Sequence, residues 1–195
     1  SDKLFVQLDV QDQGILAQLQ KYQTRSDGKK LKDELGEELY AKYQAIAESL
    51  GLKESDYENL EGWAVLNQLT MIPTLSENPY GSILGVDNFF ISKSKLQGKP
   101  VISLETVEIQ MDTLMEFYGN NKDVLLSNIE EAIEVIHSEE KIAQSKKEID
   151  NLKMNWNSGE ADKIGELFEE DESSKILTSK RDPEMARQII ELLES

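Results

Sequence analysis

Two charged side chains, Glu105 and Arg181, stand where predicted elements meet. Glu105 follows a short β-rich run at 101–104 and precedes a helical pattern, whereas Arg181 stands directly before a helix that Asp182 is predicted to cap. Polar groups at such boundaries often face ligands. A carboxylate and a guanidinium there could position a substrate or stabilise developing charge, so Glu105 and Arg181 are the candidate catalytic residues. The alternative is a structural role, because a carboxylate beside a helix N-terminus is stabilising by itself.

The single histidine, His137, follows Glu134 at a spacing of three residues. Di-metal helix bundles use this Glu-x-x-His spacing to project two ligands to one side of a helix. Such a site needs two copies of the motif and two further carboxylates, which one chain with one histidine does not supply, although a homodimer could. The alternative is a solvated polar helix face. We therefore assign no metal ligand and no cofactor to this chain. A Ser-His-acid triad stays open by composition alone, although His137 lies in a helix rich in glutamate.

Composition and motifs exclude several classes of function. The formal charge of −17 argues against nucleic-acid binding, because polyanions repel an acidic surface. The absence of cysteine excludes disulfides, thiolate metal sites and cysteine nucleophiles. No P-loop, dinucleotide-binding or α/β-hydrolase motif occurs. No run of about 18 apolar residues occurs either, so we expect no membrane insertion. The oligomeric state stays open.

In the central stretch 85–110, the spacing of the apolar residues changes from helical to strand-like and back to helical. This order predicts an α/β unit. Apolar or amphipathic residues at 86, 89, 90, 93 and 96 fall at helical spacing and give one side of this segment an apolar face. Gly98 is predicted to end that helix. A short strand follows at 100–105, and a second helical pattern starts near Val107.

The rest of the chain is predicted to be mostly helical. The best further strand candidate is 4–10. Helices are expected at 15–22 and 31–50, from a capping box at Ser55 and Glu58 as far as Pro73, along one run from 122 to a break at 155–159, and from Asp182 onward. A turn-rich loop is expected between Pro73 and Gly85.

These elements predict an α-rich α/β fold, with a helical majority around a small central sheet made by 4–10 and 100–105. We expect one domain over 1–195, with a helical N-terminal half at 11–73, a core α/β unit at 85–118 and C-terminal helices at 122–194. A sheet of two short strands is incomplete at its edges. The chain opens almost directly into a strand without an initiating Met, so we expect a piece of a longer protein.

Several motifs resemble the TraB/PrgY/GumN family, which is related to the Tiki proteases within an EreA/ChaN-like superfamily. The most specific ones are Gly-Val-Asp at 85–87, Gly-Lys-Pro-Val at 98–101 and Leu-Glu-Thr-Val-Glu-x-Gln at 104–110. Weaker matches are found at 31–40, at Trp156 with Gly159, and at Arg181-Asp182 through Ile189-Ile190. The resemblance covers nearly the whole chain.

The resemblance implies a peptidase-like, metal-dependent hydrolase in the intact protein, with this chain inactive by itself. The alternative is a non-catalytic module that binds a peptide or a partner protein. The metal chemistry proposed for the family depends on two Gly-x-x-His motifs, and this sequence contains neither. A family glutamate also aligns with Gln7, and an amide is a poor ligand for a hard metal ion. The family further implies a bacterial, extracytoplasmic protein that is secreted or lipid-anchored.

Overall fold

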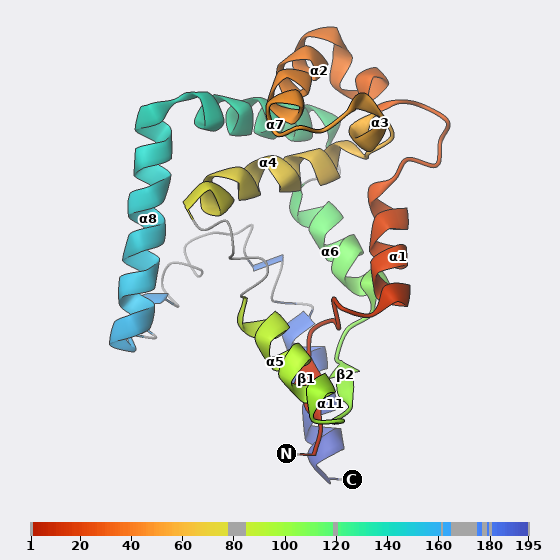
Figure 1. Ribbon diagram of the computed structural model, residues 1–195, viewed down its shortest axis with the longest axis vertical. Helices are drawn as coiled ribbons and strands as arrows, with labels where there is room; N and C mark the ends of the chain where they lie inside the picture. The colour runs from red at the N-terminus through yellow and green to blue at the C-terminus, as the bar shows by residue number, and fades with distance from the viewer. Residues whose placement is uncertain are drawn as a thin grey trace. The chain divides into compact units, whose positions relative to one another are not determined.

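The computed structural model describes residues 2–77, 85–118, 121–160, 162–164, 175–176, 179 and 181–194 (Figure 1). Most of these residues are helical, and two strands form a small parallel sheet, which confirms the α-rich α/β class. The chain divides into two compact units. Unit 1 comprises Ser1–Leu19, Pro79–Phe117 and Asn155–Ser195, and unit 2 comprises Gln20–Asn78 and Tyr118–Met154. The single-domain organisation stays a prediction.

Unit 1 contains the sheet. Strand β1 (Leu4–Val6) pairs in parallel with β2 (Val101–Ser103), and Leu4 lies opposite Val101. Helix α5 (Val86–Leu96) packs against both strands, as Figure 1 shows. Helix α6 (Val107–Tyr118) begins shortly after β2, and α11 (Arg181–Glu194) belongs to the same unit. The buried apolar side chains of this unit come from β1, α5, α6 and the residues that directly follow the two strands: Val6, Leu8, Ile91, Leu104, Val107 and Met111.

Both strands are shorter than the sequence predicts. The predicted strand 4–10 ends at Val6, because the backbone beyond it folds into turns. There the Asp9 N–H donates to the Ser103 hydroxyl over 3.0 Å, and the Gln11 N–H donates to the Asp9 carboxylate over 3.1 Å. These side-chain acceptors replace the ladder partners that a longer strand would need.

Helix α5 ends as predicted, but its exposed face is the one that the sequence marks as apolar. Gly98 follows the helix with a φ of 67°, a left-handed conformation that glycine adopts without strain. Ile91 and Ser94 are the buried side chains of the helix. Phe89 and Phe90 are exposed, so amphipathic spacing predicts the helix correctly but does not tell which side packs inward.

Unit 2 is built from helices. Helix α1 (Gln13–Gln23) enters it, and α2 (Leu31–Ser49), α3 (Glu54–Tyr57) and α4 (Gly62–Glu77) follow. Helix α7 (Lys122–His137) packs along α4 and contacts α2, and α8 (Glu139–Ser158) starts in this unit. The core has two parts, an apolar part and a tyrosine cluster, whose best-buried members are Leu31, Tyr43, Tyr57, Val65, Leu69 and Ile129.

Three details of unit 2 correct the sequence-based picture. The run expected to be unbroken from 122 is divided at Ser138, whose hydroxyl accepts from the Lys141 N–H over 3.2 Å. The predicted capping box of Ser55 and Glu58 is wrong, since Asp56 accepts from the Lys53 N–H over 2.8 Å instead. A kink at Gly36, with a φ of 78°, also interrupts α2.

Helix α4 continues through Pro73 to Glu77, four residues beyond the predicted end. Most of the loop predicted between Pro73 and Gly85 lies outside the described residues, and so do Leu167 and Phe168, for which the apolar spacing with Ile164 predicts a short helix. Within the described part of the chain, we find no helix with the length and apolar character needed to cross a bilayer.

Candidate functional site

The backbone of Glu105 is held at the carboxyl end of the two-stranded sheet. Beyond the last ladder pair, the Leu104 N–H donates to the Val6 carbonyl over 2.9 Å, and the Glu105 N–H donates to the Gln7 carbonyl over 3.1 Å. These two bonds extend the pairing past β2 and leave the Glu105 side chain between the strand and α6. The sheet therefore fixes the position from which this carboxylate leaves the main chain.

The Glu105 carboxylate and the Arg181 guanidinium bind each other. Arg181 Nε donates to Glu105 Oε1 over 2.7 Å, and Arg181 Nη2 donates to Oε2 over 2.8 Å. The side chain of Glu105 is 2% exposed and that of Arg181 is 10% exposed. The two residues predicted separately from the sequence thus form one buried, bidentate ion pair. Their pairing fixes the first residue of α11 at the carboxyl end of β2.

A second ion pair lies near the same end of the sheet. Lys95 Nζ lies 2.8 Å from Asp9 Oδ2 and joins the end of α5 to the segment after β1. The Gln11 side-chain amide donates to the Ser92 hydroxyl over 2.9 Å and adds a second connection to the same helix. Unit 1 therefore places two carboxylates, each with its own cation, at the end of a parallel sheet where α/β folds bind their ligands.

This geometry favours positioning over direct proton transfer. Two N–H groups of Arg181 are directed at Glu105, and the carboxylate uses both of its oxygens in return. A carboxylate paired in this way suits a positioning role, because protonating it would break the charge pairing. Gln7, whose carbonyl accepts from the Glu105 N–H, is exposed and carries a neutral amide.

The structure places His137 in unit 2, at the end of α7. It lines an open cavity of about 570 Å³ together with residues of α2, α7 and α8: Lys42, Ala45, Glu130, Ile133, Glu134, Ser138 and Lys141. Glu134 Oε2 lies 2.9 Å from Lys141 Nζ, and this lysine holds the pKa of the carboxyl below its usual range. The Glu134 carboxylate is therefore paired with the Lys141 ammonium group.

The donor set does not fit a metal ion. In the residues that the structure describes, no group of three or more histidine, cysteine, aspartate or glutamate side chains converges closely enough to bind one. The Glu105 carboxylate is neutralised by Arg181, and the sequence contains no Gly-x-x-His. We therefore derive no chemical step through a metal ion.

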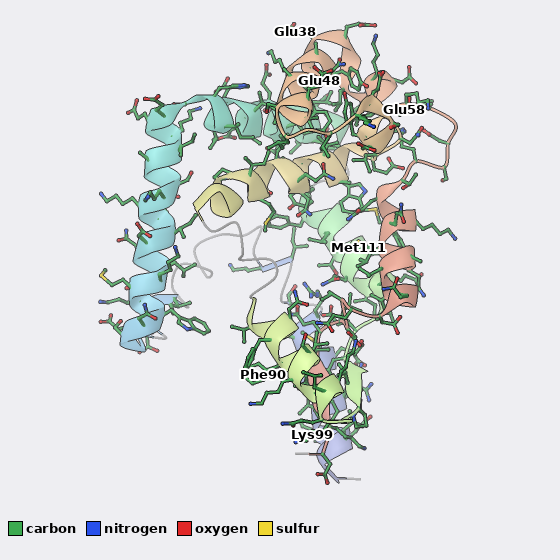
Figure 2. All side chains as sticks on the ribbon, in the orientation of Figure 1. Glu38, Glu48, Glu58, Phe90, Lys99 and Met111 are labelled. Atoms are coloured by element: carbon green, nitrogen blue, oxygen red, sulfur yellow. The ribbon has the colours of Figure 1, made fainter. Side chains whose placement is uncertain are left out.

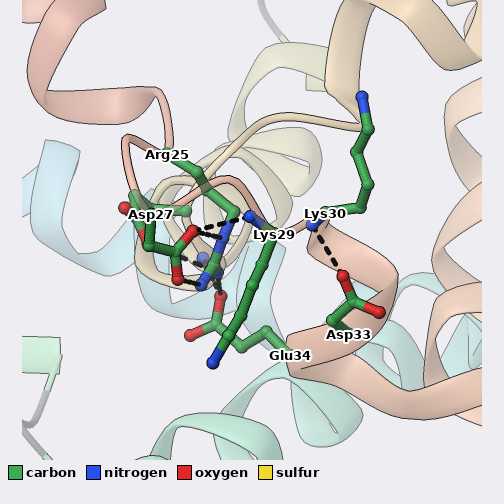
Figure 3. Close-up of polar contacts among 8 residues, drawn as sticks. Arg25, Asp27, Lys29, Lys30, Asp33 and Glu34 are labelled. Carbon is green, nitrogen blue, oxygen red and sulfur yellow. Dashed lines mark hydrogen bonds and ion pairs between the residues drawn. The ribbon is translucent and has the colours of Figure 1, made fainter.

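Sequence reasoning missed a cluster around Arg25 in unit 2, which Figure 3 shows. Arg25 Nη2 donates to Asp27 Oδ2 over 2.7 Å, Nη1 donates to Glu34, and Nη1 lies 3.4 Å from Glu61 Oε2. Glu34 also accepts from the Gly62 N–H over 2.9 Å. The guanidinium thus joins the turn after α1 to the starts of α2 and α4.

The electrostatics of this cluster follow from its charges. The hydrogen bond from Arg25 lowers the pKa of Asp27 to about 2. Burial raises the pKa of Glu61, and Arg25 opposes that shift. One cation faces three carboxylates at this point.

One sequence signal could have indicated both buried ion pairs. Of the 21 basic residues, only three are arginine, namely Arg25, Arg181 and Arg187. Arginine carries a planar fork that suits bidentate pairing with carboxylates at buried places, whereas lysine is a hydrated point charge. Two of these three arginines, Arg25 and Arg181, have side chains that are 10% exposed or less and pair with carboxylates.

Comparison with known proteins gives one match. No curated protein and no solved structure matches the chain. The sequence model of the TraB/PrgY/gumN family matches residues 1–195, which is the whole chain and includes both members of the Glu105–Arg181 pair. The resemblance read from the central motifs is therefore confirmed, and the chain belongs to the TraB/PrgY/gumN family.

Proposed function

We propose that this chain contributes the substrate-positioning wall of a peptidase-like hydrolase. The observation that supports this proposal is the buried, bidentate pair of Glu105 and Arg181 at the carboxyl end of a parallel strand. Substrate binds beside this end of the sheet, next to the exposed Gln7 and the Asp9–Lys95 pair.

Burying an ion pair costs desolvation free energy. Removing two charges from water is expensive, and well-packed apolar side chains of similar volume often hold two elements together equally well. A bidentate arginine–carboxylate pair instead fixes the relative orientation of the two side chains as well as the distance between them. Glu105 and Arg181 therefore act as positioning residues, which hold the first turn of α11 at a fixed place beside β2.

The chemical step itself is not assigned to these two residues. The family resemblance implies a divalent metal ion, but the described residues supply no ligand set for it. What the chain's own residues do is bind and orient the substrate. Glu105 and Arg181 shape the wall, and the amide of Gln7 offers one donor and one acceptor to a peptide group.

The test is cleavage of a mixed peptide library by the full-length protein, with products identified by mass spectrometry. We expect Glu105→Gln and Arg181→Lys each to lower turnover by about tenfold or more, or ~1.4 kcal/mol in transition-state energy. The matched control is Arg187→Lys, which changes an exposed arginine of the same helix that pairs with Glu184. Equal turnover in all three variants would contradict the positioning role.

A structural defect must be distinguished from a positioning defect. Far-ultraviolet circular dichroism and the urea midpoint identify variants that have unfolded. A positioning role further predicts that Arg181→Lys, which keeps the charge, raises KM and lowers kcat together while the fold is kept. If turnover follows only the unfolded fraction, the pair is purely structural.

A second candidate function is a non-catalytic module that binds a peptide or a partner protein. The α2–α7 cavity of unit 2 favours it, because exposed, apolar Ala45 lines this cavity together with the Lys42–Glu130 and Lys141–Glu134 pairs. Such a module retains library peptides without cleaving them. Ala45→Asp, at an exposed position of the cavity wall, would then abolish retention, whereas Glu105→Gln would leave it unchanged, and this contrast separates the two functions.

A further inference from the structure

Helix α5 presents an apolar face that stays exposed among the described residues of unit 1. Its inner side carries the buried Ile91 and Ser94 and packs on the two strands. On the other side, Val86 is 69% exposed, Phe89 57%, Phe90 46% and Leu96 89%. Figure 2 labels Phe90 on this helix. Four large apolar side chains on three helical turns form a surface that an unpartnered helix rarely carries.

The spacing of this face is that of a helix–helix seam. Val86, Phe89, Lys93 and Leu96 follow one another at intervals of three, four and three residues. This is the a/d pattern of a heptad, in which every seam residue inserts between residues of a facing helix. The Lys93 ammonium lies 5.7 Å from the centre of the Phe89 ring, so the one charged seam residue is already placed against an aromatic face.

We propose that α5 pairs with α5 of a second copy of this chain, in antiparallel orientation. In an antiparallel pair each a position lies opposite a d position. One register then matches the whole seam: Val86 meets Leu96 of the second copy, and Phe89 meets its Lys93. The two remaining contacts are the same ones related by two-fold symmetry, so the face is complementary to itself.

The distribution of charge selects both the partner and the orientation. The chain carries a net charge of −17, so two copies repel each other over most of their surfaces. Asp87 is the one acidic residue of α5, and the stretch 88–104 contains three lysines and no acidic residue. In an antiparallel pair the two Asp87 side chains lie at opposite ends of the seam, so the two copies meet there without opposed carboxylates. A parallel pair would place Lys93 against Lys93, whereas the antiparallel pair places it on an aromatic ring.

The size of the face sets the strength of the association. A stable interface buries about 800 Å² on each partner. One face of an 11-residue helix offers less than that. The dimer is therefore weak and reversible, and it forms as the protein concentration rises.

Cysteine cross-linking tests the orientation directly, because the chain has no cysteine of its own. Val86→Cys protein is mixed with Leu96→Cys protein under mild oxidation, with one of the two carrying an affinity tag. We expect the mixed disulfide to form at least tenfold faster than dimers of either variant alone. Ala143→Cys, at an exposed position of α8, measures cross-linking by random collision.

The outcomes are distinct. Efficient cross-linking of Val86→Cys to itself would indicate a parallel pair and overturn the proposal. Mixed disulfide at the Ala143→Cys rate would show that the helices do not pair. Both results are independent of any peptidase activity, so they leave the proposed function untouched.

Sedimentation velocity over a range of concentrations provides the second measurement. We expect Val86→Asp to weaken dimerisation by about tenfold or more, since it places a carboxylate opposite the apolar Leu96 of the second copy. Met154→Asp changes an equally exposed apolar side chain of α8 and should leave dimerisation unchanged. A monomer at every concentration would overturn the proposal. So would loss of binding to phosphatidylcholine vesicles in Val86→Asp without any change in self-association, because the face would then bind lipid.

Discussion

Arg181 and Glu105 lie 76 residues apart in the chain, yet they share two parallel hydrogen bonds of 2.7 and 2.8 Å in the interior of unit 1. Each charge is buried only because the other accompanies it. The two residues therefore act as one unit, and substituting one of them should affect stability differently from substituting both.

Replacing one partner leaves an uncompensated buried charge. We expect Arg181→Met to lower the free energy of unfolding by about 3–5 kcal/mol, the range for breaking a buried ion pair. The double variant Glu105→Leu/Arg181→Met should recover much of that loss, because no charge is left behind. Urea denaturation measures all three proteins, with Arg187→Met as the exposed control. A double variant less stable than Arg181→Met would contradict the account.

The Arg25 cluster predicts a similar effect in unit 2. Glu34 accepts from both Arg25 and the Gly62 N–H, and its side chain is 17% exposed. We expect Glu34→Gln to cost about 1–3 kcal/mol, because an amide serves both donors less well than a carboxylate. Glu37→Gln, at an exposed position on the same helix, should stay within about 0.5 kcal/mol of the parent in urea denaturation. Equal losses would show that the cluster contributes little.

Tyr57 offers a test in the opposite direction. Its hydroxyl is buried and has no hydrogen-bond partner among the described residues, whereas the Tyr43 hydroxyl donates to Gln68 over 3.2 Å. Tyr57→Phe removes an unsatisfied group, so stability should be unchanged or rise by about 1 kcal/mol. Tyr43→Phe should lower it by about 1 kcal/mol. Thermal unfolding of the two variants, compared side by side, decides the point, and a marked loss in Tyr57→Phe would reveal a missed partner.

The buried tyrosines also predict alkaline unfolding. Burial raises the pKa of Tyr43 to about 12 from an ordinary value of 10, because the charged phenolate is poorly solvated in the core. The folded state thus holds its proton at a pH where the unfolded state has lost it. The resulting stability is fully present below pH 10 and declines as the pH rises to about 12. Urea midpoints measured from pH 9 upward should fall less steeply in Tyr43→Phe. An unchanged slope would assign the alkaline transition to other groups.

Helices α2, α7 and α5 show which features of the fold apolar spacing predicts and which it does not. Apolar spacing predicted a helix at 31–50, and the structure has Leu31–Ser49. The break at Ser138 escaped prediction, because no glycine or proline marks it and a serine hydroxyl caps the next helix instead. Likewise, the apolar stripe of α5 was visible, but periodicity alone does not tell which side of a helix faces the core.

At the candidate site, the sequence indicated individual residues but not the contacts between them. Glu105 and Arg181 were each selected for a position at an element boundary. Glu105 follows β2 as predicted, but Arg181 is the first residue of α11, so Asp182 lies inside the helix and is not its cap. Their mutual contact was not foreseen, because nothing in the sequence relates two residues so distant from each other. The Arg25 cluster was missed for a related reason, since its partners lie in three separate segments.

The parallel pairing of β1 with β2 has a consequence for how the protein is made. Leu4 leaves the ribosome first, but its ladder partner Val101 is synthesised about a hundred residues later. Unit 2 contributes most of the chain between the two strands, and its helices can form from local contacts while the first strand is still unpaired. Strand β1 therefore stays unpaired while the segment between the two strands is synthesised, which makes it the natural segment for a chaperone to hold.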